Sequence, residues 1–416
     1  MEVTALGAIL GLAIAIFLII RKVHPAYALI LGALIGGLVG GAGLVGTVSL
    51  MIGGAQGIMT AVLRILTAGV LAGVLIESGA ANSIAETIIK RIGEARALFA
   101  LVLATAILTA VGVFIDVAVI TTAPIALAIA SRLNISKTAI LLAMIGGGKS
   151  GNIISPNPNA IAAADAFEIP LTSVMAAGII PALFGLVVTY IIAKKLIGKG
   201  TRVLETELTT TAGELPGFFP SVLGPLVAIT LLSLRPLFDI IIDPLIALPT
   251  GAAVGALAMG KIKHLSKYAS VGLARMSGVA ILLIGTGTIA GIIANSGLRD
   301  LLSSGLESAG LPAFFLAPVA GILMSGATAS TTAGTAVASQ VFGNTILALG
   351  VSRVSAAAMI HSGATVLDHL PHGSFFHATG GSVYLDIKER LKVIPYETLV
   401  GLTLVIVSTI IYGIIL

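Results

Sequence analysis

The chain has 416 residues, of which 57% are hydrophobic and only 10% charged, and its mean hydropathy is +1.12. This balance excludes a water-soluble globular enzyme and indicates a polytopic helical membrane protein surrounded by lipid. The formal net charge of +5 is better explained by loop topology than by nucleic-acid binding, and the absence of cysteine excludes disulfides and thiolate chemistry.

Apolar runs long enough to cross a bilayer occur along the whole chain. We place them at about 3–20, 25–45, 58–77, 171–197, 218–234, 242–260, 272–295 and 394–416. Between them, the regions 97–131 and 312–341 each hold two shorter apolar runs, for which we expect re-entrant hairpins. The regions 139–165 and 352–380 are interrupted by polar residues, and here we expect broken helices.

These segments recur in the same order, between 210 and 219 residues later in the chain. The run AGVLIESG at 72–79, for example, resembles AGIIANSG at 290–297. Each half then has three spans, a hairpin, an interrupted span and a final span, and because five crossings is an odd number the second half is inverted. We therefore predict an all-α inverted repeat of about ten spans and two hairpins, with repeats at 1–197 and 218–416 joined by a cytoplasmic linker at 198–217.

Basic residues agree with this count. Of the 23 Lys and Arg residues, 18 fall in loops of one face, Arg275 among them, three fall on the other face, and Arg64 and Lys149 lie within spans. Because Lys and Arg concentrate in cytoplasmic loops, we place both termini outside the cytoplasm of a prokaryotic inner membrane. Arg64 is expected to snorkel or to pair with Glu77.

Hydroxyl-rich segments are predicted at the two hairpin bends, at 116–124 and 325–335, and each contains a Thr-Thr-Ala run. Hydroxyls and helix N-termini can replace the hydration shell of a carboxylate or a small cation. Alternatively, such hydroxyls bond to their own helix and only permit close packing. The hairpin candidates for substrate binding are Thr121, Thr122, Ser330, Thr331 and Thr332, and the candidate for ion coupling is Asp116.

A continuous helix cannot pass through the run SPNPN at 155–159, because proline lacks an N–H and displaces the preceding residue from the helical region. In lipid, such a break survives only where it faces protein or a water-filled cavity. Ionisable residues inside a membrane are functional by default, and Lys149 would pair either with a substrate carboxylate or with Asp116. The candidates for substrate binding here are Asn152, Ser155, Asn157, Asn159, Asp368, His369 and His372, with Lys149 and Asp368 also as candidates for ion coupling.

The run GGGKS at 146–150 lacks the spacing of a phosphate-binding loop, so an ATP-driven pump is not indicated. No catalytic pair, pore ring or zinc motif is evident, which argues against an intramembrane enzyme or a channel. We expect no cofactor and no metal site, only a coupling proton or sodium ion.

The runs SPNPNAIAAA at 155–164 and LDHLPHG at 367–373 resemble the paired proline-containing motifs of the gluconate permease family, within the ion transporter superfamily. This resemblance implies a homodimer in which a transport domain, about 97–170 plus 312–380, moves against a scaffold built from the remaining spans. It also implies symport of a small organic carboxylate, such as gluconate, with protons or sodium. The alternative is a sodium/proton antiporter in which Asp116 and Asp368 exchange the ions.

Overall fold

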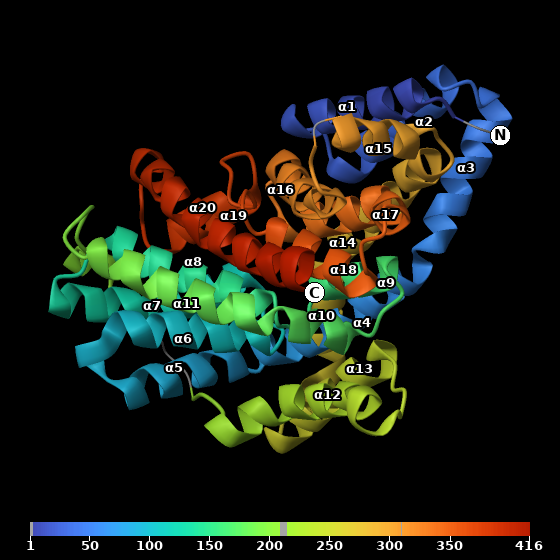
Figure 1. The fold of residues 1–416 in the computed structure, drawn as a ribbon. Coiled ribbons are helices and arrows are strands. Elements are labelled where there is room, and N and C mark those ends of the chain that lie inside the picture. Colours follow the sequence, from blue (N-terminus) through green and yellow to red (C-terminus); the bar gives the residue numbers. More distant parts are fainter. Residues whose placement is uncertain (1–2, 209–213, 309) are drawn as a thin grey trace.

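The structure, a computed structural model, describes residues 3–208, 214–308 and 310–416 (Figure 1). Within these ranges the chain is helical, and β-structure is limited to two isolated bridges. The first half contains α1 (Ala5–Ile20), α2 (Pro25–Val39), α3 (Gly43–Gly57), α4 (Met59–Glu77), α5 (Ala80–Ile92), α6 (Ala97–Ala110), α7 (Ile115–Leu133), α8 (Lys137–Asn152), α9 (Pro158–Ala166), α10 (Leu171–Ala177) and α11 (Ile179–Lys195).

The second half repeats this order, except that α14 stands where the first half has α3 and α4, and α20 stands where it has α10 and α11. Its helices are α12 (Phe218–Phe238), α13 (Pro244–Ala258), α14 (Leu265–Ala294), α15 (Leu298–Ser308), α16 (Leu316–Thr328), α17 (Thr331–Ala348), α18 (Arg353–Gly363), α19 (Ser374–Ser382) and α20 (Ile387–Thr409). The predicted all-α repeat of two halves is confirmed.

Five helical segments of the described chain are long and apolar enough to cross a membrane: α4, α7, α12, α14 with the short turn before it, and α20. Two further candidates are bent pairs, α5 with α6 at 98° and α9 with α10 at 113°. Shorter apolar helices, α1, α2, α13 and α16, complete the set. The polytopic membrane class that the composition predicted is therefore confirmed.

Both interruptions lie where the polar and proline residues placed them. In the first half, α8 ends at Asn152 and α9 begins at Pro158, which occupies the first helical turn, where its missing N–H leaves no bond unmade. In the second half, α18 ends at Gly363 and α19 begins at Ser374. Each half thus leaves a stretch of non-helical backbone between two half-helices.

The first hairpin bend differs from the prediction, which centred it on residues 116–124. The chain reverses instead between α6 and α7, at residues 111–114, where Gly112 has φ +105° and therefore needs the freedom of glycine. Pro124 lies inside α7 and is accommodated there, because it removes a single helical bond. The second bend lies where it was predicted, at Ala329–Ser330 between α16 and α17.

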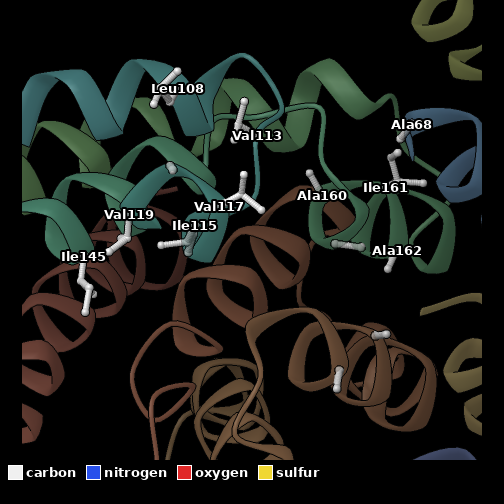
Figure 2. Packing of buried hydrophobic residues seen from close by; sticks show 14 of the residues in the cluster. Ala68, Leu108, Val113, Ile115, Val117, Val119, Ile145, Ala160, Ile161 and Ala162 are labelled. Atoms are coloured by element: carbon white, nitrogen blue, oxygen red, sulfur yellow. The ribbon is translucent and has the colours of Figure 1, made fainter. Parts of the chain in front are cut away.

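The helices pack into two groups (Figure 1). Helices α1–α4 pack with α12–α14, while α6–α11 pack with α16–α20, and α11 and α20 lie on α8 and α18. In Figure 1 the pair α1–α2 and the pair α12–α13 lie on opposite sides of the remaining helices. Figure 2 shows one contact between the groups, where Ile161 of α9 lies beside Ala68 of α4. The two groups therefore meet mainly where α14 packs on α17 and α4 on α9, with smaller contacts between α1 and α16 and between α10 and α12.

The linker between the repeats is tied to the second group. Lys137 of α8 donates to Glu207 Oε1 at 2.5 Å, and Thr201 donates its N–H to Glu389 Oε1 at 2.6 Å. Burial opposes ionisation of Glu207, but hydrogen bonds from Lys137 and from the Leu204 N–H lower its pKa below the ordinary value. Residues 209–213 of the predicted linker lie outside the described residues.

Gly272 lets α4 and α14 approach closely, and its replacement by alanine is expected to lower the unfolding temperature. A Cβ at this position would overlap the Gly69 backbone and would lie 3.2 Å from the Gly73 Cα. Overpacking of this kind costs about 1–3 kcal/mol. The matched control is Gly278→Ala on the same helix, where nothing lies within 4 Å of the added Cβ. Thermal unfolding of both purified variants checks this, and equal midpoints would contradict the close approach.

Candidate functional site

A cavity of about 490 Å³ lies where the hairpin bends and the broken helices meet α14. Its volume is in the range of sites for small organic molecules. The lining comes from both halves of the chain and from both groups of helices. The polar and charged side chains of this lining are His24, Asp116, Asn152, Asn159, Arg275, Thr328, Ser330, Thr331, Thr332, Asp368 and Ser374.

The first turns of five helices lie at this cavity: α2, α7, α9, α17 and α19. Ser330 caps α17 and accepts a hydrogen bond from the Ala333 N–H at 3.3 Å, so the first N–H groups of the helix remain available. Asp116 lies in the first turn of α7, where its Oδ1 accepts from the Val117 N–H at 2.9 Å. Helix N-termini carry partial positive charge, so their convergence favours an anion in the cavity.

A buried charged network lies behind one wall of the cavity. Lys149, with 0% of its surface exposed, donates to Asp368 Oδ1 at 2.5 Å and to the Thr365 carbonyl at 2.6 Å. The third neighbour of its ammonium is His369 Nδ1, at 2.9 Å. The partner of Lys149 is therefore Asp368 and not Asp116, because the second break brings this carboxylate against the end of α8. One ion pair thus joins the two repeats.

The same network reaches the cavity through Asp368. Its second oxygen, Oδ2, accepts from the Thr331 hydroxyl at 2.5 Å, and both residues line the cavity. On the far side, His369 Nε2 lies 3.1 Å from the Thr398 hydroxyl and 3.2 Å from the Ile394 carbonyl. A change of charge at Asp368 would therefore be felt both by Lys149 and by whatever contacts Thr331.

The first break is organised by Asn157. Its Oδ1 accepts from the N–H groups of Asn159 and Ala160, both at 3.0 Å, and so caps α9. Its Nδ2 donates to the Asn152 carbonyl at 2.7 Å and to Asn152 Oδ1 at 2.6 Å. Asn159 in turn accepts from the Thr332 hydroxyl at 2.5 Å, which links the first break to the second hairpin. The Nδ2 of Asn152 is buried and has no partner among the described residues.

We expect Asn157→Ala to lower the stability of the protein by about 1–2 kcal/mol, because α9 loses its cap and Asn152 loses its donor. Asn157→Ser is the matched control, since serine restores a capping oxygen but does not reach Asn152. Thermal unfolding of the two variants separates the contributions. A serine variant that is no more stable than the alanine variant would show that the cap contributes nothing.

Seven predicted site residues do not line this cavity: Thr121, Thr122, Lys149, Ser155, Asn157, His369 and His372. Thr122 donates to the Ala118 carbonyl at 2.8 Å and contacts Met144 Sδ at 3.0 Å, so its hydroxyl is used in packing. His372 lies with Nε2 3.2 Å from the Ala327 carbonyl, and the Ser155 hydroxyl is buried without a partner among the described residues. The two Thr-Thr-Ala runs thus differ: the second faces the cavity and the first does not.

Arg275 and His24 line the cavity, although the sequence did not single them out for it. Arg275 was counted among loop residues, and the loop placement is wrong, because Arg275 lies inside α14, which begins ten residues earlier at Leu265. For His24 the sequence held a signal, because His24-Pro25 begins one span of the first repeat and Asp243-Pro244 begins the corresponding span of the second.

A smaller cavity, of about 80 Å³, lies at the start of α13, and its lining includes Asp243, Pro244 and Arg64. Arg64 of α4 forms an ion pair with Asp165 of α9 and donates to Asp243, with Nη2 2.5 Å from Oδ2 and Nε 3.1 Å from Oδ1. The predicted pairing of Arg64 with Glu77 is wrong, because α9 and the start of α13 converge on this part of α4 and bring Asp165 and Asp243 to Arg64. Through Asp165 the bridge joins the two groups of helices.

The chain matches the model described as "GntP family permease" over residues 3–249 and that described as "Na+-H+ antiporter family" over residues 220–309. An "Uncharacterized transporter" of Haemophilus influenzae is 67% identical over 413 residues, which is 99% of each chain. A "Gluconate permease" of Pseudomonas aeruginosa is 25% identical over 408 residues, 89% of this chain and 88% of that one. The "High-affinity gluconate transporter" of Escherichia coli is 22% identical over 402 residues, 89% and 90% of the two chains.

Among solved structures, the YdaH transporter of Alcanivorax borkumensis, described as having an unusual topology, is similar in fold. Its TM-score is 0.67 at 15% identity, and the match covers 96% of this chain and 98% of that chain. At this identity the likeness concerns the fold alone.

Proposed function

The chain belongs to the GntP family of permeases, and on that premise we propose that it carries a small organic carboxylate across the cytoplasmic membrane by ion-coupled symport. Gluconate or a related hydroxy acid is the proposed substrate. The observation that carries the proposal is the cavity of about 490 Å³, where the N-termini of several helices meet hydroxyl and amide side chains. The helix ends suit a carboxylate, and Thr331, Thr332, Asn152 and Asn159 suit the hydroxyl groups of a sugar acid.

Asp368 is the proposed coupling residue. It contacts the cavity on one side and Lys149 on the other, so a proton or sodium ion bound there changes the pairing inside the transporter. Asp116 is proposed as a second ion-binding group, because it is the other carboxylate on the cavity wall. The dependence of uptake on proton and sodium concentration shows whether one or both of these carboxylates bind a coupling ion.

For alternating access we propose that one group of helices moves against the other. The packing supports a transport domain that includes α11 and α20 in addition to the predicted 97–170 and 312–380, since these helices lie on α8 and α18. Helices α1–α4 and α12–α14 then form the scaffold, which in the proposed homodimer holds the subunit contact. Both termini are proposed to lie outside the cytoplasm, so that the larger cavity opens inward.

Uptake into proteoliposomes tests this function. We expect purified protein to accumulate radiolabelled gluconate, or a shorter hydroxy acid from a panel, when a proton or a sodium gradient is imposed, and not when the gradient is collapsed by an ionophore. Accumulation of no carboxylate under either gradient would overturn the proposal.

A sodium/proton antiporter is the second candidate, favoured by the match of residues 220–309 to an antiporter family model. Asp116 and Asp368 would then exchange the two ions without an organic substrate. Vesicles loaded with a pH-sensitive dye distinguish the two functions: sodium-driven proton movement in the absence of any carboxylate is expected of an antiporter only.

A further inference from the structure

We propose that Arg275 binds the carboxylate of the substrate, so that the substrate is bound between the scaffold and the transport domain. This inference deepens the proposed function and rests on it. The sequence directed attention to Lys149 as the cation for a substrate carboxylate. The structure assigns that task to a different helix.

Lys149 cannot take the substrate carboxylate without losing its own partners. An ammonium group has three N–H donors, and those of Lys149 face Asp368, the Thr365 carbonyl and His369. Its side chain is fully buried, and it is absent from the cavity wall. The charge of Lys149 is already balanced by Asp368, so the pair offers an arriving anion no net attraction.

Arg275 has the opposite properties. It is the one Lys or Arg side chain on the described wall of this cavity, and it is exposed there. It forms no ion pair within 4.0 Å among the described residues, and the charge that it interacts with on this wall is that of Asp116. Its position ten residues after the start of α14 places it about 15 Å along the helix, within the candidate membrane span.

The geometry opposite Arg275 completes an anion site. The N-termini of α7 and α17 face the same cavity from the transport domain, and they supply partial positive charge but no full charge. The Nδ2 group of Asn152, a residue 4% exposed on this wall, is a buried donor that has no acceptor among the described residues. A carboxylate in the cavity would satisfy this donor and pair with the guanidinium, which binds carboxylates in a two-pronged manner.

This arrangement defines the substrate class more narrowly. One guanidinium on the wall matches one carboxylate, and the neighbouring Thr331, Thr332 and Asn159 match a hydroxylated chain attached to it. We therefore expect hydroxylated monocarboxylates to bind, and their uncharged amides to bind much more weakly. Because Arg275 belongs to the scaffold and the hydroxyl-binding residues belong to the transport domain, a bound substrate would contact both domains at once.

The test is the affinity of purified protein for gluconate and for the amide of gluconic acid, measured by isothermal titration. Arg275→Gln is expected to weaken gluconate binding at least about tenfold and to leave the weak binding of the amide unchanged, while Arg275→Lys keeps part of the affinity. Lys267→Gln is the matched control, since it removes one positive charge from the same helix at a residue outside the cavity wall. It is expected to bind as the parent does.

Asp116 provides a second control, because Arg275 could act only by balancing that carboxylate. In that case Arg275→Gln combined with Asp116→Asn would regain the parental affinity, and this result would overturn the proposal. Parental gluconate affinity in Arg275→Gln alone would overturn it as well, and would leave the proposed function intact. Failure of the parent to bind gluconate or any carboxylate of the panel would overturn the proposed function and this inference together.

Discussion

Asp368→Asn is expected to abolish coupled uptake and to lower the stability of the protein by about 3–5 kcal/mol. The substitution leaves the ammonium of Lys149 buried without a counter-charge, and breaking a buried pair from one side has a cost of this size. It also removes the proposed coupling carboxylate, so gluconate accumulation in proteoliposomes should fall to the level of empty vesicles. Thermal unfolding in detergent and uptake under an imposed gradient measure the two effects.

The double variant Lys149→Met with Asp368→Asn separates structure from function. Both charges are gone, so most of the lost stability should return, while Asn still accepts from the Thr331 hydroxyl. Uptake should remain absent, because no ion site is left. Restored uptake in the double variant, or parental uptake in Asp368→Asn, would show that the pair is only structural.

The two interruptions could be predicted because their cause is local. Proline at 156 and 158 forbids a continuous helix whatever surrounds it, and the second break follows from the repeat. The first bend was placed at its hydroxyl-rich run, 116–124, but that run lies inside α7, which also accommodates Pro124, and the chain reverses earlier, at Gly112. Hydroxyl-rich residues near a bend do not by themselves locate it.

Partners across the repeats could not be predicted from one sequence. Lys149 and Asp368 are 219 residues apart, and nothing in the spacing says that Lys149 meets this carboxylate and not Asp116. Arg275 was missed because the count of basic residues assigned it to a loop, although it lies within the apolar run at 272–295 and within α14, which begins at Leu265. The amphipathic α5 had a readable signal, with Ala81, Ile84, Ala85 and Ile88 spaced on one face.

Arg64→Gln is expected to open the smaller cavity. In this structure that cavity has about 80 Å³ against about 490 Å³ for the larger one, and the ion pair between Arg64 and Asp165 ties the two groups of helices together beside it. Alternating access requires this tie to break when the groups move apart. The chain has no cysteine, so single reporters can be labelled without background. We expect Arg64→Gln to speed maleimide labelling of a Thr172→Cys reporter at the small cavity and to slow that of a Ser374→Cys reporter at the large one.

The two carboxylates bound by Arg64 provide the decisive comparison. Asp243 precedes α13 in the same group of helices as Arg64, whereas Asp165 belongs to α9 in the other group. If the bridge holds the groups together, Asp165→Asn should change the labelling rates as Arg64→Gln does, by at least about threefold, and Asp243→Asn should change them little. Equal effects of the two substitutions, or unchanged rates in Arg64→Gln, would mean that Arg64 only balances buried charge. A selective effect of Asp165→Asn has no such explanation, because either substitution removes one negative charge from the same arginine.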